Sequence, residues 1–151
     1  WRYRMNIYDG VLKFHGTWRT YQKRILENTD KYLADGKIHI VAAPGSGKTT
    51  LGIELIRRIG EPCLILSPSI TIRQQWIARM EEGFLQEGCV PQEWFSNDIR
   101  NIRPVTVITY QALHSAVKQY AGVLNEETEI ENYLKMAKKS LITGLLTFWK
   151  Q

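Results

Sequence analysis

Cysteine is scarce in this sequence, which holds only Cys63 and Cys89 among its 151 residues. Two cysteines are too few for a disulfide framework, and no Cys/His spacing resembles a zinc site. No apolar run approaches the length of a membrane-spanning helix, and the N-terminal residues lack the apolar stretch of a signal peptide. Internal repeats and low-complexity tracts are missing as well. These absences predict a reduced, cytoplasmic protein without a membrane partner, in which Cys63 is a buried core thiol.

The composition is that of an ordinary globular domain, with 44% hydrophobic and 23% charged residues. The formal net charge of +5 favours a polyanionic partner, although a solvated basic surface is the more common cause. Aromatic and basic residues alternate within the first twenty-one positions. Such a segment either grips nucleic acid or forms a small β-element packed on the main domain, and we favour the second interpretation.

The most informative segment is Ala42–Thr49, which reads Ala-Ala-Pro-Gly-Ser-Gly-Lys-Thr and fits the phosphate-binding loop pattern. The apolar run Ile38–Ala42 leads into it and predicts a short buried strand. After it, Leu51, Leu55 and Ile59 recur every four residues, which predicts a helix. A strand, a glycine-rich loop and a helix are the context that this motif requires. The alternative, a chance glycine turn that binds nothing, is disfavoured because both flanking elements agree.

The predicted loop binds a nucleoside triphosphate through backbone amides, which glycine allows to point at phosphate oxygens. The following helix adds its free N–H groups and the positive end of its dipole. Lys48 reaches the β- and γ-phosphates and the Thr49 hydroxyl binds Mg²⁺, so these two are the catalytic candidates. The predicted nucleotide-binding residues of the loop and first helical turn are Pro44, Gly45, Ser46, Gly47, Lys48, Thr49 and Thr50.

Further strands and helices alternate along the chain. Strands are predicted at Cys63–Leu66 and Val105–Thr109, and a helix at Tyr110–Tyr120, while 85–104 reads as irregular. Ser69 is placed to cap the intervening helix. A stripe of apolar residues marks that helix: Ile72, Trp76, Met80 and Phe84.

This alternation predicts an α/β domain of three layers whose parallel strands are joined by right-handed crossovers. The turns Ala42–Thr49, Ser67–Ser69 and Thr109–Gln111 each follow a strand, so we expect them to share one edge. We divide the chain into an accessory segment at 1–17, an α/β lobe at 18–120 and a helical extension at 121–151. In that extension the apolar residues keep helical spacing: Ile130, Leu134, Ala137, Leu141 and Leu145.

In this order the strand-end motifs resemble those of superfamily 2 helicases and translocases, in the DEAD/DEAH-like branch that includes type III restriction subunits and repair translocases. Trp18–Gln22 is similar to the Arg-x-Tyr-Gln segment that precedes the first strand in that family. The resemblance implies that Gln22 hydrogen-bonds the adenine and that Tyr21 or a neighbour packs beside it. An amide suits this role because it donates and accepts on one base edge.

The resemblance continues at the other strand ends. Leu66–Ser69 is similar to the family's motif with a Pro-Thr pair, and Thr109–Leu113 resembles its Thr-Tyr-Gln segment. It implies a RecA-like P-loop fold, ATP and Mg²⁺ as cofactors, and nucleic acid as the partner, with DNA favoured over RNA. The nucleic-acid contacts that it implies are Ser67, Pro68, Ser69, Thr109, Tyr110 and Gln111.

One family motif is absent from the sequence. The family's Asp-Glu-x-His or Asp-Glu-x-Asp motif holds the Mg²⁺ shell and activates water, but no aspartate here is followed by glutamate. We therefore expect a truncated first lobe, inactive alone, from a parent helicase or translocase with a second motor lobe. The alternatives are a small P-loop kinase and a non-catalytic nucleotide-binding module.

Overall fold

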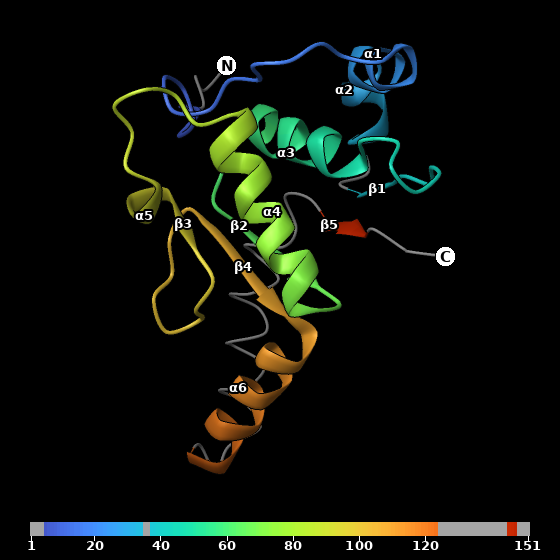
Figure 1. The fold of residues 1–151 in the computed structure, drawn as a ribbon. Coiled ribbons are helices and arrows are strands. Elements are labelled where there is room, and N and C mark those ends of the chain that lie inside the picture. The colour runs from blue at the N-terminus through green and yellow to red at the C-terminus, as the bar shows by residue number, and fades with distance from the viewer. Residues whose placement is uncertain (1–4, 35–36, 124–144, 148–151) are drawn as a thin grey trace. The chain divides into compact units, whose positions relative to one another are not determined.

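The structure is a computed structural model that describes residues 5–34, 37–123 and 145–147 (Figure 1). The chain forms two compact units. Unit 1 comprises 1–61, 78–89 and 142–151, and unit 2 comprises 62–77 and 90–141.

Unit 1 contains a two-stranded parallel sheet in which β1 (Lys37–His39) pairs with β5 (Leu145–Thr147). Three helices belong to it as well: α1 (Thr20–Glu27), α2 (Thr29–Tyr32) and α3 (Lys48–Ile59). The predicted first strand is shorter than expected, because Ile40–Ala42 already lie outside β1. The predicted helical extension is wrong at Leu145, because this residue begins strand β5.

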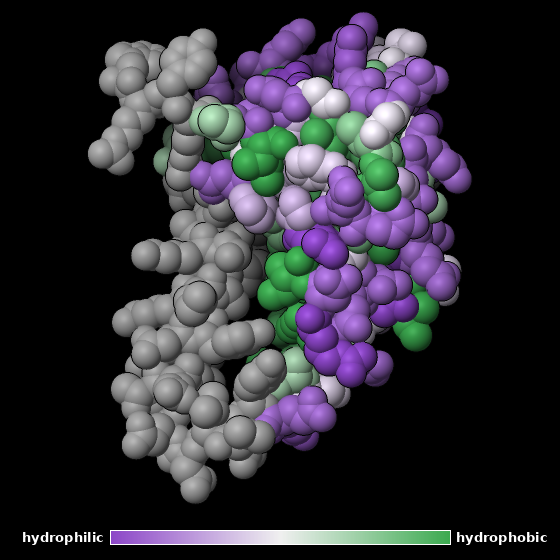
Figure 2. Space-filling model, turned by 90° about the vertical axis from the view of Figure 1, so that its left-hand side faces the viewer, coloured by the Kyte–Doolittle hydropathy of each residue, from purple (hydrophilic) through white to green (hydrophobic). Residues whose placement is uncertain are grey.

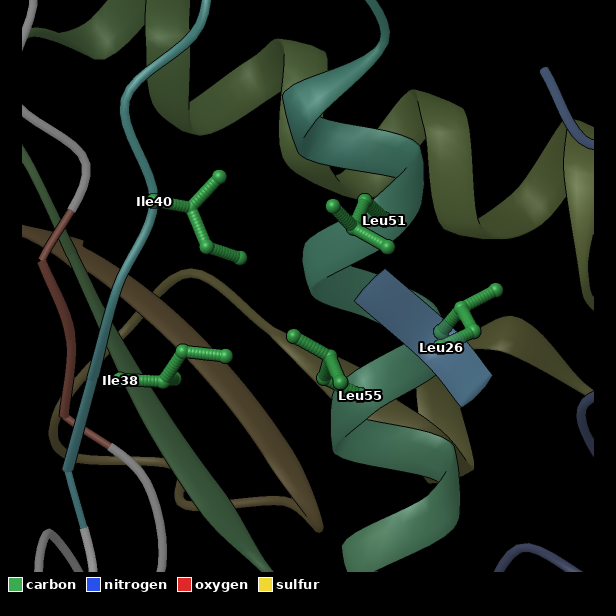
Figure 3. Close-up of a cluster of buried hydrophobic side chains, with 5 residues drawn as sticks. All are labelled: Leu26, Ile38, Ile40, Leu51 and Leu55. Carbon is green, nitrogen blue, oxygen red and sulfur yellow. The ribbon is translucent and has the colours of Figure 1, made fainter. Parts of the chain in front are cut away.

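A cluster of apolar side chains from α1, the β1 segment and α3 forms the core beside the glycine-rich loop (Figure 3). Leu51 and Leu55 are fully buried, as their spacing predicts, and they lie between Leu26 and the pair Ile38 and Ile40. Each such side chain contributes about 1.5–3 kcal/mol when it leaves water. The core therefore fixes α3, and with it the loop that leads into α3, against α1.

The N-terminal segment packs on unit 1. The Tyr8 side chain is 1% exposed, and its hydroxyl donates to the Glu61 carbonyl at 2.7 Å. Leu12 forms an antiparallel bridge with Leu85, and Phe14 stacks on Trp18 with ring centroids 4.0 Å apart. The N-terminal segment therefore packs on unit 1, and its β-type pairing within the described residues is the isolated bridge of Leu12 with Leu85.

Unit 2 holds a three-stranded parallel sheet of order β2-β4-β3. All five residues of β4 are buried, which explains its run of β-branched side chains. The bounds of its strands are β2 (Cys63–Ser67), β3 (Phe95–Ser96) and β4 (Val105–Thr109). Helices α5 (Pro91–Trp94) and α6 (Tyr110–Val123) accompany them, and α4 (Ile70–Gly83) is divided between the two units after Ile77.

The predicted α/β class with parallel strands is confirmed, and the predicted third strand and the helices after the loop and after β2 lie where expected. Two expectations in unit 2 are wrong. The segment 85–104 is not wholly irregular, because it contains α5 and β3. Cys63 is only half-buried and is not a core thiol. Most of the predicted extension at 121–151 lies outside the described residues.

The described surface is largely polar. Figure 2 shows hydrophilic residues over most of the described face, with hydrophobic residues in small separate groups. Among the helices that the structure describes, none combines the length and apolar character needed to cross a membrane.

Candidate nucleotide-binding site

The glycine-rich loop begins with a tight turn. The Ser46 amide donates to the Ala43 carbonyl at 3.2 Å, which closes a four-residue turn over Pro44 and Gly45. Gly45 has a φ of 74°, the left-handed conformation that the third position of a type II turn requires. Proline at the second position fixes its own φ in the range that this turn needs. The local sequence therefore explains how the chain reverses after β1.

Gly47 joins this turn to α3. Its φ of 88° is left-handed, and its carbonyl accepts the first helical hydrogen bond, from the Leu51 amide at 3.1 Å. A Cβ at this position would lie 2.6 Å from the Gln22 Nε2 atom, so space and backbone both select glycine. Beyond Gly47, the free amides and the positive dipole end of α3 form an environment that favours phosphate.

Two polar side chains of the loop are placed to serve a phosphate ligand. The Lys48 ammonium donates to the Ala42 carbonyl and so connects the two ends of the loop. The Ser46 hydroxyl is buried and has no hydrogen-bond partner among the residues that the structure describes. A buried hydroxyl left unpaired costs about 1–3 kcal/mol, which a ligand oxygen would recover. The donors present therefore fit a triphosphate.

The fit for Mg²⁺ rests on Thr49, which lies in the first turn of α3. Proteins hold Mg²⁺ with one or two side-chain oxygens, while the nucleotide phosphates and water complete the shell. No group of three metal-ligating side chains occurs in the described part of the chain. Thr49 thus fits as one ligand beside the phosphates, and its role stays a prediction.

Three consecutive carbonyls of the loop accept hydrogen bonds from side chains at the start of α1. This set of contacts, which we call the clasp, joins segments that lie about one strand and one helix apart in the sequence. Its members are Arg19 Nη1 to the Gly45 carbonyl at 3.0 Å, Tyr21 Oη to the Ser46 carbonyl at 2.5 Å and Gln22 Nε2 to the Gly47 carbonyl at 3.0 Å. Tyr21 and Gln22 are among the residues predicted from the sequence, and Arg19 is not.

Gln22 is 3% exposed, and both ends of its amide are engaged inside unit 1. Its Oε1 atom accepts from the Arg19 amide at 2.8 Å while Nε2 donates to the Gly47 carbonyl. Each amide end keeps one further hydrogen-bonding position, a lone pair on oxygen and a hydrogen on nitrogen. The predicted contact with adenine remains a prediction, and the orientation of the amide is set by the protein itself.

A buried carboxylate lies on α3 behind the loop. Glu54 is 3% exposed and pairs with Arg57 at 2.7 Å and with Arg58 at 3.1 Å. Its hydrogen bond to Arg57 raises the pKa of that guanidinium. Arg58 also donates to the Leu26 carbonyl of α1 at 2.9 Å, so the cluster ties α3 to α1. The spacing of both arginines, three and four residues after Glu54, is the signal in the sequence that could have identified this cluster.

The predicted nucleic-acid residues lie at one edge of the sheet in unit 2. The register aligns Ser67 with Thr109, so the turns after β2 and β4 lie side by side, as expected. The Ser69 hydroxyl accepts from the Ile72 amide at 3.2 Å, and the Thr109 hydroxyl accepts from the Ala112 amide at 3.1 Å. Both hydroxyls therefore cap helices, as predicted for Ser69, and each keeps its own hydrogen for donation.

The remaining predicted contacts of this edge are accessible. Tyr110 is 53% exposed, and Pro68 and Gln111 are exposed as well. Ser67 differs, because it is buried and its hydroxyl donates to the Ser69 carbonyl at 2.9 Å. Ser67 thus stabilises the turn from inside, and Thr109 is buried as well, at 8% exposed. The residues accessible to a partner are Pro68, Ser69, Tyr110 and Gln111.

Comparison with known proteins matches the chain to a restriction-enzyme family model and to proteins named as DNA helicases. The model of the family described as type III restriction enzyme, res subunit, matches residues 15–142, which is most of the chain. The chain is 33% identical over 93 residues, 59% of its length, to the DNA 3'-5' helicase XPB of Mycobacterium tuberculosis. It is 33% identical over 72 residues, 48% of its length, to a putative DNA 3'-5' helicase Rad25 of Halobacterium salinarum. The chain spans only 16% and 12% of these two curated relatives.

Proposed function

Because the chain belongs to the family of type III restriction enzyme res subunits, within the superfamily 2 helicases, we propose that it is ATP-binding sequence from the first lobe of a DNA helicase or translocase. The observation that carries the proposal is the loop before α3. Its two left-handed glycines, its unpaired Ser46 hydroxyl and the amino end of α3 surround a position that suits phosphate.

In this proposal the residues of unit 1 bind and orient ATP. Lys48 exchanges the Ala42 carbonyl for β- and γ-phosphate oxygens, and the Ser46 hydroxyl donates to a phosphate oxygen. Thr49 supplies one ligand for Mg²⁺, which neutralises phosphate charge when it is bound. Tyr21 and Gln22 are proposed to contact the adenine base.

The edge formed by the turns after β2 and β4 binds the DNA backbone in this proposal. Ser69 and Thr109 each have a hydroxyl hydrogen to donate, and both lie at helix N-termini whose dipoles favour phosphate. Two relatives are named DNA helicases, and the chain carries a net charge of +5. The positive charge suits either nucleic acid, and the names of the relatives favour DNA over RNA.

Hydrolysis requires groups that this sequence does not supply. A general base and a complete Mg²⁺ shell are expected from an Asp-Glu motif, which is absent here, and from a second motor lobe. We therefore propose that the chain alone binds ATP without hydrolysing it at a useful rate. The whole protein is proposed to hydrolyse ATP in a reduced, cytoplasmic setting.

The test is ATP hydrolysis by the full-length protein, measured alone and with single- and double-stranded DNA and RNA. We expect stimulation by DNA and its loss in the Lys48→Ala variant, because that variant lacks the phosphate-binding cation. If RNA alone stimulates hydrolysis, the proposed substrate becomes RNA in place of DNA. Tight ATP binding with no stimulation by any nucleic acid would replace the motor with a kinase or a non-catalytic nucleotide-binding module.

A further inference from the structure

The clasp acts on peptide planes of the loop and not only on single atoms. A trans peptide holds its C=O and its following N–H in one plane and on opposite sides. A donor that fixes the Ser46 carbonyl therefore also fixes the Gly47 amide, which then points away from the donor. The Tyr21 hydroxyl makes this contact at 2.5 Å.

The neighbouring planes are held in the same way. Arg19 holds the Gly45 carbonyl from its exposed position, and Gln22 holds the Gly47 carbonyl together with the Leu51 amide. Glycine imposes little preference of its own at these planes, because it reaches positive and negative φ with similar ease. The orientation of the Gly47 and Lys48 amides therefore depends on donors outside the loop, whereas the Ser46 amide is held by the Ala43 carbonyl.

We infer that Tyr21 is a positioning residue that aims the Gly47 amide at phosphate, independently of any contact with the base. This inference rests on the proposed function, since it concerns the same nucleotide site. It differs from the base-packing role that the family resemblance implies for Tyr21. The hydroxyl oxygen is the atom that distinguishes the two roles, because packing beside a base needs only the ring.

The sharpest variant is Tyr21→Phe, which keeps the ring and removes the hydroxyl. Affinities for Mg²⁺-tripolyphosphate and for Mg²⁺-ATP are measured by calorimetry on the full-length protein. We expect both affinities to fall by a similar factor of about 3 to 10, the usual effect of one hydrogen bond. Because tripolyphosphate has no base, a loss of affinity for it reports on phosphate positioning by the loop.

A matched control separates positioning from stability. Tyr8→Phe removes a comparable hydroxyl contact in the same unit, to the Glu61 carbonyl at 2.7 Å, far along the chain from the loop. We expect it to lower the free energy of unfolding and to leave both affinities unchanged. If Tyr8→Phe weakens tripolyphosphate as much as Tyr21→Phe does, the effect is general destabilisation and the inference fails.

Three further outcomes overturn the inference in distinguishable ways. Unchanged affinities in Tyr21→Phe, with ATP still bound by the wild type, refute the positioning role and leave the proposed function intact. A loss for ATP but not for tripolyphosphate assigns Tyr21 to the base. A wild-type protein that binds neither ligand removes the proposed function together with the inference.

Discussion

The loop before α3 and the turns after β2 and β4 are both proposed to bind phosphate, yet they are stabilised in different ways. The loop is held from outside, because its carbonyls accept from side chains about 25 residues earlier in the chain. Each turn in unit 2 is held from within, because Ser69 and Thr109 cap their own helices three residues ahead. The comparison teaches that the nucleotide loop depends on a distant segment in addition to its own local turn, whereas the strand-end turns depend on their own sequence.

The largest expected effect is at Gly47, where the loop meets the clasp. Gly47→Ala adds a methyl group 2.6 Å from the Gln22 Nε2 atom and places a side chain at a φ of 88°. Strain of this kind costs about 1–3 kcal/mol, so we expect ATP affinity to fall by about 30-fold in a calorimetric titration.

Gly10→Ala is the control for this variant. Gly10 has a similar φ of 76°, but an added Cβ there meets nothing within 4 Å. It should lower the free energy of unfolding by about 1–2 kcal/mol from backbone strain alone and leave ATP binding unchanged. Wild-type ATP affinity in Gly47→Ala would show that the loop tolerates displacement of Gln22. The clasp would then not be required for ATP binding.

The next effect is at Glu54, which supports the loop through the connection between α3 and α1. Glu54→Gln removes the charge that pairs with Arg57 and Arg58. Because both arginines are partly solvated, we expect a loss of about 2 kcal/mol in the free energy of unfolding, measured by denaturant titration. Glu82→Gln, at an exposed position of α4, should change it by less than about 0.5 kcal/mol. Equal effects of the two substitutions would contradict a stabilising cluster.

A smaller effect is expected at the locally held turns. Thr109→Val keeps the shape of the side chain and removes the cap of α6, so the free energy of unfolding should fall by about 1 kcal/mol. ATP affinity should not change, since the cap lies within unit 2. Thr71→Val, at an exposed position in the first turn of α4, is the control without a capping bond. A fall in ATP affinity in Thr109→Val alone would show that the turns are not independent of the nucleotide loop.

The smallest effect concerns an exposed pair in unit 2. The hydrogen bond from Arg100 lowers the pKa of Asp98 below its ordinary value of 3.8. Since the folded pKa is depressed, the contribution of the pair to stability is present above pH 3.8 and is lost as pH falls through the lower, folded value. The difference in unfolding stability between wild type and Asp98→Asn should therefore be constant at neutral pH and shrink in acid. A difference that persists at the lowest pH would contradict this assignment.

The features predicted correctly from sequence are those set by local chemistry. The turn at Pro44 and Gly45, the helix beginning at Lys48 and the cap at Ser69 each follow from residues within a few positions. The buried strand β4 was also identifiable, because a run of five consecutive β-branched residues favours a strand.

The missed features depend on pairing over long sequence distances. Phe95 and Ser96 form a strand only because β4 offers its edge, and Leu145 joins β1 although its spacing suits a helix. Arg19 was overlooked for the same reason, since its contact with the Gly45 carbonyl is visible only in three dimensions. Periodicity in a single sequence reports on the surroundings of an element and does not identify its partner.

The central claim is that the loop before α3 is a nucleotide site, and calorimetry of ATP binding to the full-length wild type and to Lys48→Ala tests it most directly. Lys48 is partly exposed and lies outside the buried core, so its removal should leave the fold intact. The account predicts that the wild type binds ATP and that Lys48→Ala, with an unchanged free energy of unfolding, binds at least about 30-fold more weakly, as loss of a charged phosphate contact requires. Equal affinity in the two proteins would contradict it.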